Sequence, residues 1–222
     1  MELSQSNKTA LLLGATGLVG GHLLTALLGD ENYVQIIAPT RRPLPPPLRD
    51  RPRLTNPVVD FDRLTTELEG FACDDLYLAL GTTRKTAGSA EAFRRVDYDY
   101  VILAAAVARR RGAGQCLLVS SAGADAASRL LYPRTKGEVE RDLRKMGFWA
   151  LHIFRPGVLV GDRREFRPAE QLSKYVMQAI ERLSPKILGK YNPTGADHLA
   201  QRMVQAARTV EGGVFYYEEP EL

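Results

Sequence analysis

The stretch Lys8-Thr-Ala-Leu-Leu-Leu-Gly14-Ala-Thr-Gly17-Leu-Val-Gly20-Gly-His-Leu-Leu24 decides the fold of this chain. A short apolar run typical of a buried strand leads into three glycines with the spacing G-x-x-G-x-x-G, and an apolar helix follows. In such a turn one glycine allows the tight bend, one lets the backbone approach a pyrophosphate, and one lets the helix pack on the strand. The pattern predicts a dinucleotide site at the helix N-terminus, whose free N–H groups attract phosphates. Its predicted contact residues are Gly14, Ala15, Thr16, Gly17, Leu18 and Val19.

The chain has 222 residues, enough for one domain with a sizeable core, and its 45% of hydrophobic residues is ordinary for a globular protein. Cys73 and Cys116 lack metal-ligand spacing, so we predict reduced, partly buried thiols and no metal site. We expect structural roles for His22, His152 and His198, which lie far apart in sequence.

The sequence pI of about 9.1 raises the question of nucleic-acid binding. The basic residues are scattered, mostly in pairs, and no aromatic residues interleave with them as a stacking platform would need. We therefore predict no nucleic-acid partner. No apolar run reaches the length of a membrane span, and the first residues show no basic region followed by an apolar core and a cleavage site. The expectation is a soluble cytoplasmic protein.

Strand and helix patterns alternate along the chain, which predicts an α/β fold with a Rossmann-type, doubly wound parallel sheet. The proline-rich residues 39–57 are expected to form a surface loop without regular structure. Residues 8–160 would form the cofactor-binding core, and residues 161–222 a small substrate-side lobe that cannot fold alone. The predicted strands are 10–13, 34–38, 57–60, 76–80, 116–120, 149–154 and 214–217, and the predicted helices are 18–28, 90–110, 135–146, 171–183 and 197–209.

Ligands of such sheets bind beyond the carboxyl ends of the strands, so the residues after each strand matter most. After the second strand, Arg41 and Arg42 stand where an NAD site would place an acidic residue for the ribose hydroxyls. Two guanidinium groups suit a 2′-phosphate, which favours NADP(H) as the cofactor. Asp60 and Phe61 follow the third strand and are predicted to contact the adenine; the alternative for Asp60 is an ordinary cap.

Leu80, Gly81 and Thr82 follow the fourth strand and are also predicted to contact the cofactor. Gly81 would let the backbone pass close to the nicotinamide-side ribose. The polar run 81–88 is long enough for a mobile loop over the site, and the alternative is a turn that leads into a helix.

Ser120 and Ser121 follow the fifth strand, and Tyr132 and Lys136 share one face of the helix that comes next. A lysine cation beside a phenol favours the ionised phenol and makes it a usable general acid or base, while a nearby hydroxyl can hold a substrate oxygen. We predict a catalytic serine, tyrosine and lysine at this place. The alternative is a helix-surface pair near two polar turn residues.

At these motifs the chain resembles an atypical short-chain dehydrogenase/reductase, and more specifically the Tat-interacting oxidoreductase family and its bacterial relatives. The resemblance covers about residues 8–168. The matching phrases are Gly14-Ala-Thr-Gly17, Thr40-Arg41-Arg42, Val59-Asp60-Phe61, Leu80-Gly81-Thr82-Thr83-Arg84, residues 93–101, Ser120-Ser121, residues 136–140 and residues 154–159.

The resemblance implies NADPH as the cofactor, Tyr132 as the proton donor and Lys136 as its partner. By analogy with classical reductases it implies Ser121 as the active hydroxyl, although the gap between Ser121 and Tyr132 is short for that class. Cofactor contacts are implied for the glycine turn and for Arg41, Arg42, Leu80, Gly81, Tyr132, Lys136, Leu159 and Arg167.

Two functions stay open at this point. One is the NADPH-dependent reduction of a small carbonyl substrate, and the other is an NADPH-binding regulatory or scaffold protein with an idle site. The Tyr132–Lys136 pair favours the enzyme, because a pure sensor needs no phenol beside a lysine. The identity of the substrate, a protein partner and a homo-oligomer are not decided by the sequence.

Overall fold

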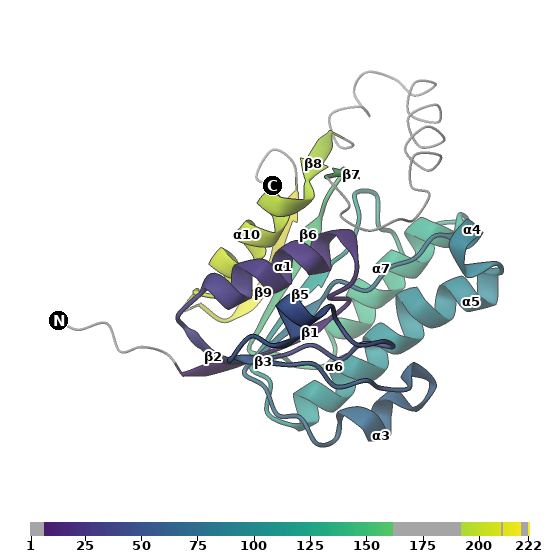
Figure 1. The fold of residues 1–222 in the computed structure, drawn as a ribbon. Coiled ribbons are helices and arrows are strands. Elements are labelled where there is room, and N and C mark those ends of the chain that lie inside the picture. Colours follow the sequence, from purple (N-terminus) through teal and green to yellow (C-terminus); the bar gives the residue numbers. More distant parts are fainter. Residues whose placement is uncertain (1–6, 162–191, 210, 219–221) are drawn as a thin grey trace.

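The computed structural model describes residues 7–161, 192–209, 211–218 and 222, and a seven-stranded sheet forms its centre (Figure 1). All of its strand pairs are parallel, and the strand order is β3-β2-β1-β4-β5-β6-β9. The order reverses between β1 and β4, which are direct neighbours. The strands are β1 (Lys8–Leu13), β2 (Tyr33–Ile37), β3 (Leu54–Thr55), β4 (Asp75–Leu78), β5 (Gln115–Val119), β6 (Ala150–Arg155) and β9 (Gly213–Glu218). The predicted Rossmann-type, doubly wound fold is confirmed.

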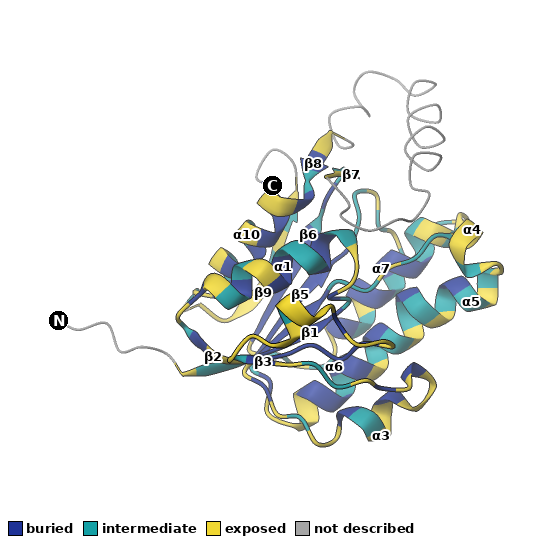
Figure 2. Cartoon of the chain, in the orientation of Figure 1, coloured by how far each residue is buried: buried dark blue, intermediate teal, exposed yellow. Residues whose placement is uncertain are grey.

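Helices cover both faces of this sheet and enclose two apolar cores (Figure 2). Because the central strands are buried on both faces, β1 ends in the apolar run Ala10–Leu13, in which Leu11, Leu12 and Leu13 are each at most 1% exposed. One face carries α1 (Leu18–Gly29) and α10 (Ala196–Ala206), and the other carries α3 (Leu64–Leu68), α6 (Tyr100–Arg110) and α7 (Leu131–Leu143).

Short elements complete the described chain. The long helix predicted over 90–110 is present with an irregular turn inside it, because α5 (Ala90–Arg94), a π-helical segment (Arg95–Asp99) and α6 follow one another without a break. The short elements are α2 (Pro46–Arg49), a 3-10 turn (Phe61–Arg63), α4 (Arg84–Ala87), α5 (Ala90–Arg94), the π-helical segment Arg95–Asp99, and the strands β7 (Val158–Val160) and β8 (Pro193–Gly195), which pair with each other.

The third strand lies earlier than predicted. It spans Leu54–Thr55 and not residues 57–60. Pro57 has no N–H group for a strand ladder, and the preceding Asn56 uses its side chain instead, donating to the Ala38 carbonyl at 2.7 Å.

Two segments predicted as loops contain helical turns. Within the proline-rich residues 39–57, α2 begins at Pro46, a position where a helix needs no N–H group. Within the polar run 81–88, the Thr83 hydroxyl accepts a hydrogen bond from the Thr86 N–H at 3.0 Å and caps α4. This polar run is therefore a turn that leads into a helix.

The described C-terminal residues extend the main sheet. β9 pairs with β6 along its whole length, from Gly213 opposite Ala150 to Glu218 opposite Arg155. α10 packs against α1 on the same face. Residues 162–191 of the predicted substrate-side lobe lie outside the described residues, and the predicted helix 171–183 is among them. The lobe therefore stays a prediction.

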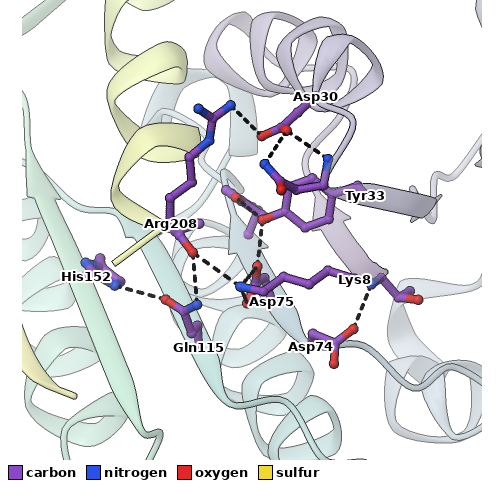
Figure 3. A network of polar contacts seen from close by, with 12 residues as sticks. Lys8, Asp30, Tyr33, Asp74, Asp75, Gln115, His152 and Arg208 are labelled. Atoms are coloured by element: carbon purple, nitrogen blue, oxygen red, sulfur yellow. Dashed lines mark hydrogen bonds and ion pairs between the residues drawn. The ribbon is translucent and has the colours of Figure 1, made fainter. Parts of the chain in front are cut away.

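A buried polar network closes the amino-terminal end of the sheet (Figure 3). At the start of β4, Asp75 accepts hydrogen bonds from the Lys8 ammonium at 3.1 Å and from the Tyr33 phenol at 2.6 Å. At the start of β5, Gln115 donates to the Ala207 carbonyl, just after α10, at 3.0 Å. These bonds satisfy buried polar groups and attach the end of α10 to the sheet.

His152 extends this network along β6. Its ring is fully buried, lies within hydrogen-bonding distance of Gln115 (3.2 Å) and Tyr217 (3.0 Å), and stacks on Phe215. Burial, with a contribution from the Lys8 charge, lowers the pKa of His152 to about 4. The imidazole is therefore neutral at neutral pH and joins β5, β6 and β9.

Candidate functional site

The glycine turn lies between the carboxyl ends of β1 and β4. Gly14 has a φ of +96°, and a Cβ at this position would lie 2.5 Å from the Ala79 carbonyl oxygen. A Cβ on Gly20 would lie 1.9 Å from the Gly14 oxygen, so α1 can approach the turn only with a glycine there. These two glycines serve the tight bend and the close helix packing.

Gly17 has a different environment. It is exposed at the N-terminus of α1, and a Cβ there would meet only the Gly14 oxygen at 3.2 Å and the Ala79 oxygen at 3.9 Å. Among the described residues no side chain caps this end of α1, and the first turn of the helix contains no acidic residue. The free N–H groups and the positive helix end therefore form a place where a phosphate is favourable.

Arg41 and Arg42 follow β2 near the same edge of the sheet. Both are exposed, and no ion pair among the described residues contains either of them. Thr40 fixes the segment, because its hydroxyl donates to the Arg42 carbonyl at 2.6 Å and its backbone bridges to Val58. Two guanidinium groups that pair with no described acidic residue are thus attached to an anchored backbone.

Asp60 and Phe61 are engaged within the protein. The Asp60 carboxylate accepts a hydrogen bond from the Asp62 N–H at 3.0 Å and caps the 3-10 turn. Phe61 is 8% exposed and packs edge-on against Tyr100, with 5.4 Å between ring centroids. The contact of both residues with an adenine stays a prediction.

Beyond β4, the backbone meets a buried ion pair. The Lys136 ammonium lies 2.9 Å from Asp97, and the two side chains are 7% and 1% exposed. The other carboxylate oxygen of Asp97 accepts a hydrogen bond from the Thr82 N–H at 2.8 Å. A Cβ on Gly81 would lie 3.7 Å from Asp97 and 4.0 Å from the Lys136 ammonium. Of the predicted cofactor residues after β4, Gly81 therefore lies beside the predicted catalytic lysine, and Thr82 is bonded to its partner Asp97.

Tyr132 lies in the first turn of α7, which begins at Leu131 and not at residue 135 as predicted. Its ring centroid is 6.0 Å from the Lys136 ammonium and 6.0 Å from the Phe93 ring centroid. The Tyr132 side chain is 46% exposed. The structure thus brings the predicted tyrosine and lysine together, with the phenol at the surface and the ammonium in the interior.

The two serines after β5 have different environments. Ser120 is buried, and its hydroxyl donates to the buried Glu140, which in turn pairs with Arg155. Ser121 is partly exposed and donates to the Ala122 carbonyl at 3.0 Å. The Ser120 hydroxyl is therefore committed to a structural network, whereas Ser121 makes a local contact that a ligand can replace. No hydrogen bond between described residues joins Ser121 to Tyr132.

The segment between Ser121 and Tyr132 folds back onto α7. The Asp125 N–H donates to the Pro133 carbonyl at 3.0 Å. A Cβ on Gly137 would lie 2.2 Å from the Ala126 nitrogen, so this backbone touches the helix itself. Gly137 therefore permits the close packing that keeps a short connection between the serines and the tyrosine.

The last predicted contacts come from the segment after β6. Leu159 lies in β7, partly buried against the core between α1 and α10. A Cβ on the nearby Gly161 would lie 3.2 Å from the Leu18 side chain, so this segment borders the start of α1. Arg167 lies outside the described residues. Both contacts with a cofactor stay predictions.

Asp97 and Glu140 are parts of this site that were not singled out from the sequence. A signal was present, because Asp97 comes four residues after Phe93 and four before Val101 on the buried face of its helix. Glu140 lies one helical turn after Lys136 on the buried face of α7. A charged residue at an apolar position requires a partner in the fold.

The residues at this edge suit a dinucleotide. The glycine turn has an exposed backbone at Gly17, no described side chain caps the start of α1, and Arg41 and Arg42 provide positive charge. These are the donors that phosphate groups require. Their position, where the strand order reverses between β1 and β4, is the usual ligand site of a doubly wound sheet.

Comparison with known proteins agrees with this geometry. The chain belongs to the NAD dependent epimerase/dehydratase family, whose model matches residues 10–202. It is 39% identical over 174 residues to Protein HTATIP2 of Rattus norvegicus, and the aligned region covers 78% of this chain and 72% of that protein. It is 40% identical over 160 residues to Protein FMP52, mitochondrial, of Candida albicans, covering 71% and 69% of the two chains. The resemblance that the motifs indicated is confirmed.

Solved structures show the same fold. The Helicobacter pylori ADP-L-glycero-D-manno-heptose-6-epimerase superposes with a TM-score of 0.67 at 16% identity, covering 98% of this chain and 79% of that one. The Bordetella bronchiseptica enzyme WbmH, solved in complex with NAD+, gives 0.69 at 15% identity, covering 96% and 75%. These two likenesses show the fold, and the family model shows the NAD dependent epimerase/dehydratase family.

The predicted cytoplasmic location is wrong on these comparisons. Relatives from Candida albicans and Aspergillus niger, the latter 38% identical over 167 residues, are both named mitochondrial. Within the described segments, no helix combines the length and apolar character needed to cross a membrane.

Proposed function

We propose that this protein is an NADP(H)-preferring oxidoreductase that reduces a small carbonyl substrate, with Tyr132 as the proton donor. The observation that carries the proposal is the juxtaposition of Tyr132, Lys136 and Gly81 at the edge where the strand order reverses. A half-exposed phenol can reach a substrate, and a buried ammonium beside it stabilises negative charge on its oxygen.

The cofactor preference follows from the charges after β2. Arg41 and Arg42 have no acidic partner among the described residues, so their guanidinium groups are available for a 2′-phosphate. The N-terminus of α1 would hold the pyrophosphate. Further proposed contacts with the cofactor are those of Ala15, Thr16, Leu18, Val19, Asp60, Phe61, Leu80, Thr82, Leu159 and Arg167.

When bound, NADPH would supply the hydride, with its electron pair, that reduces the carbonyl carbon. The Tyr132 O–H bond breaks and its proton passes to the carbonyl oxygen, so the product is an alcohol and the phenol becomes a phenolate. Lys136 lies one helical turn away and stabilises this phenolate until solvent returns the proton. Ser121 is placed to donate a hydrogen bond to the substrate oxygen once it leaves the Ala122 carbonyl.

Calorimetry with NADPH and NADH tests the cofactor half of this proposal. The native protein should bind NADPH more tightly, and replacing either Arg41 or Arg42 by alanine should weaken NADPH binding by about 1.5–3 kcal/mol for each charged hydrogen bond lost. Arg51→Ala, an exposed arginine in the same proline-rich segment, is the matched control and should leave affinity unchanged. Equal native affinities for NADPH and NADH would refute the preference.

Assays of NADPH oxidation with a panel of aldehydes and ketones test the catalytic half. The alternative function, an NADPH-binding regulatory or scaffold protein, predicts tight NADPH binding without turnover of any carbonyl. Turnover that disappears in Tyr132→Phe supports the enzyme, whereas binding without turnover supports the regulatory protein.

A further inference from the structure

Lys136 does not stand alone beside Tyr132. Its ammonium contacts Asp97 at 2.9 Å, and both side chains are almost completely enclosed. The same carboxylate accepts the Thr82 N–H at 2.8 Å. One side chain therefore connects α7 with the backbone that follows β4.

The local backbone is built to present Asp97 to these partners. Asp97 lies in the π-helical segment between α5 and α6, and such insertions are rare and concentrated at functional sites. The segment packs against α7. Burying a carboxylate there costs free energy unless it is paired, so the position is specific for a charged contact and not for core packing.

We propose that Asp97 is a positioning residue, which holds the Lys136 ammonium and the Thr82 backbone in one geometry beside Tyr132. Its effect on turnover rests on the proposed function. The contact of Asp97 with Lys136 is independent of the proposed function, because it is present in the protein without cofactor or substrate.

Two carboxylates lie near Lys136, and the charges around the ammonium favour Asp97 over Glu140 as the positioning residue. Burial acts to lower the pKa of Lys136, but the Asp97 charge, followed by smaller effects of Tyr132 and Glu140, raises it above its ordinary value. Glu140 is shared with Arg155, which contacts it at 2.6 Å, and accepts from Ser120. Asp97 therefore provides the main compensation for the buried ammonium.

Asp97→Asn tests the proposal, because it keeps the size and an acceptor for the Thr82 N–H but removes the charge. Asp75→Asn is the matched control, since it removes the carboxylate of the buried lysine–aspartate pair at the opposite end of the sheet. The first readout is the ionisation of Lys136, followed by NMR of ¹³C-labelled lysine and assigned with Lys136→Met. We expect Lys136 to lose its proton at a lower pH in Asp97→Asn, and to titrate as in the native protein in Asp75→Asn.

The second readout is the pH profile of NADPH-dependent turnover. In Asp97→Asn the rate should fall by about 10²-fold, and its alkaline limb should move to lower pH, because the lysine is displaced and loses its charge. Asp97→Glu, which keeps the charge but displaces it, should leave Lys136 charged while turnover falls. This variant also keeps the test valid if Asp97→Asn does not fold.

An unchanged Lys136 titration in Asp97→Asn would overturn the positioning role. Absence of turnover in the native protein would instead reject the proposed function, and the lysine titration would still decide the role of Asp97.

Discussion

The two ends of the sheet each hold a lysine–aspartate pair with a buried aspartate, yet the pairs differ in what surrounds them. At the amino-terminal end Lys8 and Asp75 are 3.1 Å apart, and at the carboxyl-terminal end Lys136 and Asp97 are 2.9 Å apart. Both aspartates are 1% exposed, but Lys8 is 28% exposed and Lys136 only 7%. The first lysine can reach water, whereas the second depends on its partner.

The surroundings separate the two pairs further. Asp75 is enclosed by the phenols of Tyr33 and Tyr77, which lie 2.8 Å apart, and Lys8 also reaches the Ala207 carbonyl. The polar groups around Asp75 thus bond to one another, which is what a structural network requires. The Lys136 pair instead adjoins the half-exposed Tyr132 phenol and the exposed Gly81 backbone. A buried ion pair by itself is therefore weak evidence for a functional site, and the half-exposed phenol beside Lys136 is the observation that supports our proposal of one there.

The sharpest test of this contrast compares a phenol from each end. Tyr132→Phe should slow turnover by about 10²–10⁴-fold while NADPH affinity stays nearly unchanged, because the ring remains and only the proton is lost. Tyr33→Phe removes a buried hydroxyl from the other network, and it should lower stability without changing turnover per folded molecule. Steady-state kinetics and calorimetry measure both effects. Equal turnover by native protein and Tyr132→Phe would contradict the mechanism.

The amino-terminal end should respond to acid. The pKa of His152 is about 4 in the folded protein and about 6.5 when unfolded. Between pH 6.5 and pH 4 the imidazole is therefore protonated in the unfolded chain but not in the folded chain. The free energy of unfolding should fall as the pH is lowered through this range, by up to about 3 kcal/mol. Chemical denaturation across this range measures the slope, and His152→Gln should flatten it. A slope that is unchanged in that variant would show that other groups cause the loss.

Two glycines of the turn should separate folding from binding. Gly20→Ala places a Cβ 1.9 Å from the Gly14 oxygen and should destabilise the fold by about 1–3 kcal/mol. Gly17→Ala meets its nearest backbone atom at 3.2 Å and should keep the fold but weaken NADPH binding, because the added methyl group occupies the proposed phosphate site. Thermal unfolding and calorimetry distinguish the two. Undiminished NADPH affinity in Gly17→Ala would show that the phosphates bind elsewhere.

The smallest effect is expected where the amino-terminal network reaches the surface. Arg208 contacts the buried Asp30 at 3.1 Å, but the arginine side chain is 60% exposed. Arg208→Ala should cost less than about 1 kcal/mol of stability, since water replaces most of an exposed partner. Denaturant titration measures this change. A loss of several kcal/mol would mean that this ion pair is essential to the attachment of α10.

Elements whose bounds follow from neighbouring residues could be predicted from the sequence. Elements whose bounds depend on contacts with other parts of the fold could not. The apolar run before Gly14 and the helix after Gly17 both lie close to their predicted bounds. The third strand was misplaced, because Pro57 and the side-chain bonds of Asn56 override the apolar pattern there. The start of α7 was placed too late, although this helix brings Tyr132 and Lys136 onto one face.

The sequence by itself determined the parallel sheet, the glycine turn and the four-residue spacing of Tyr132 and Lys136. These depend on neighbouring residues, because a bend with positive φ requires glycine and a helical turn fixes which side chains share a face. Only the tertiary structure decided that Ser120 belongs to the Glu140 network and that Asp97 holds Lys136. Those contacts join elements far apart in sequence, and the physical reason is burial: a charge excluded from water must find its partner among whatever the packed fold brings beside it.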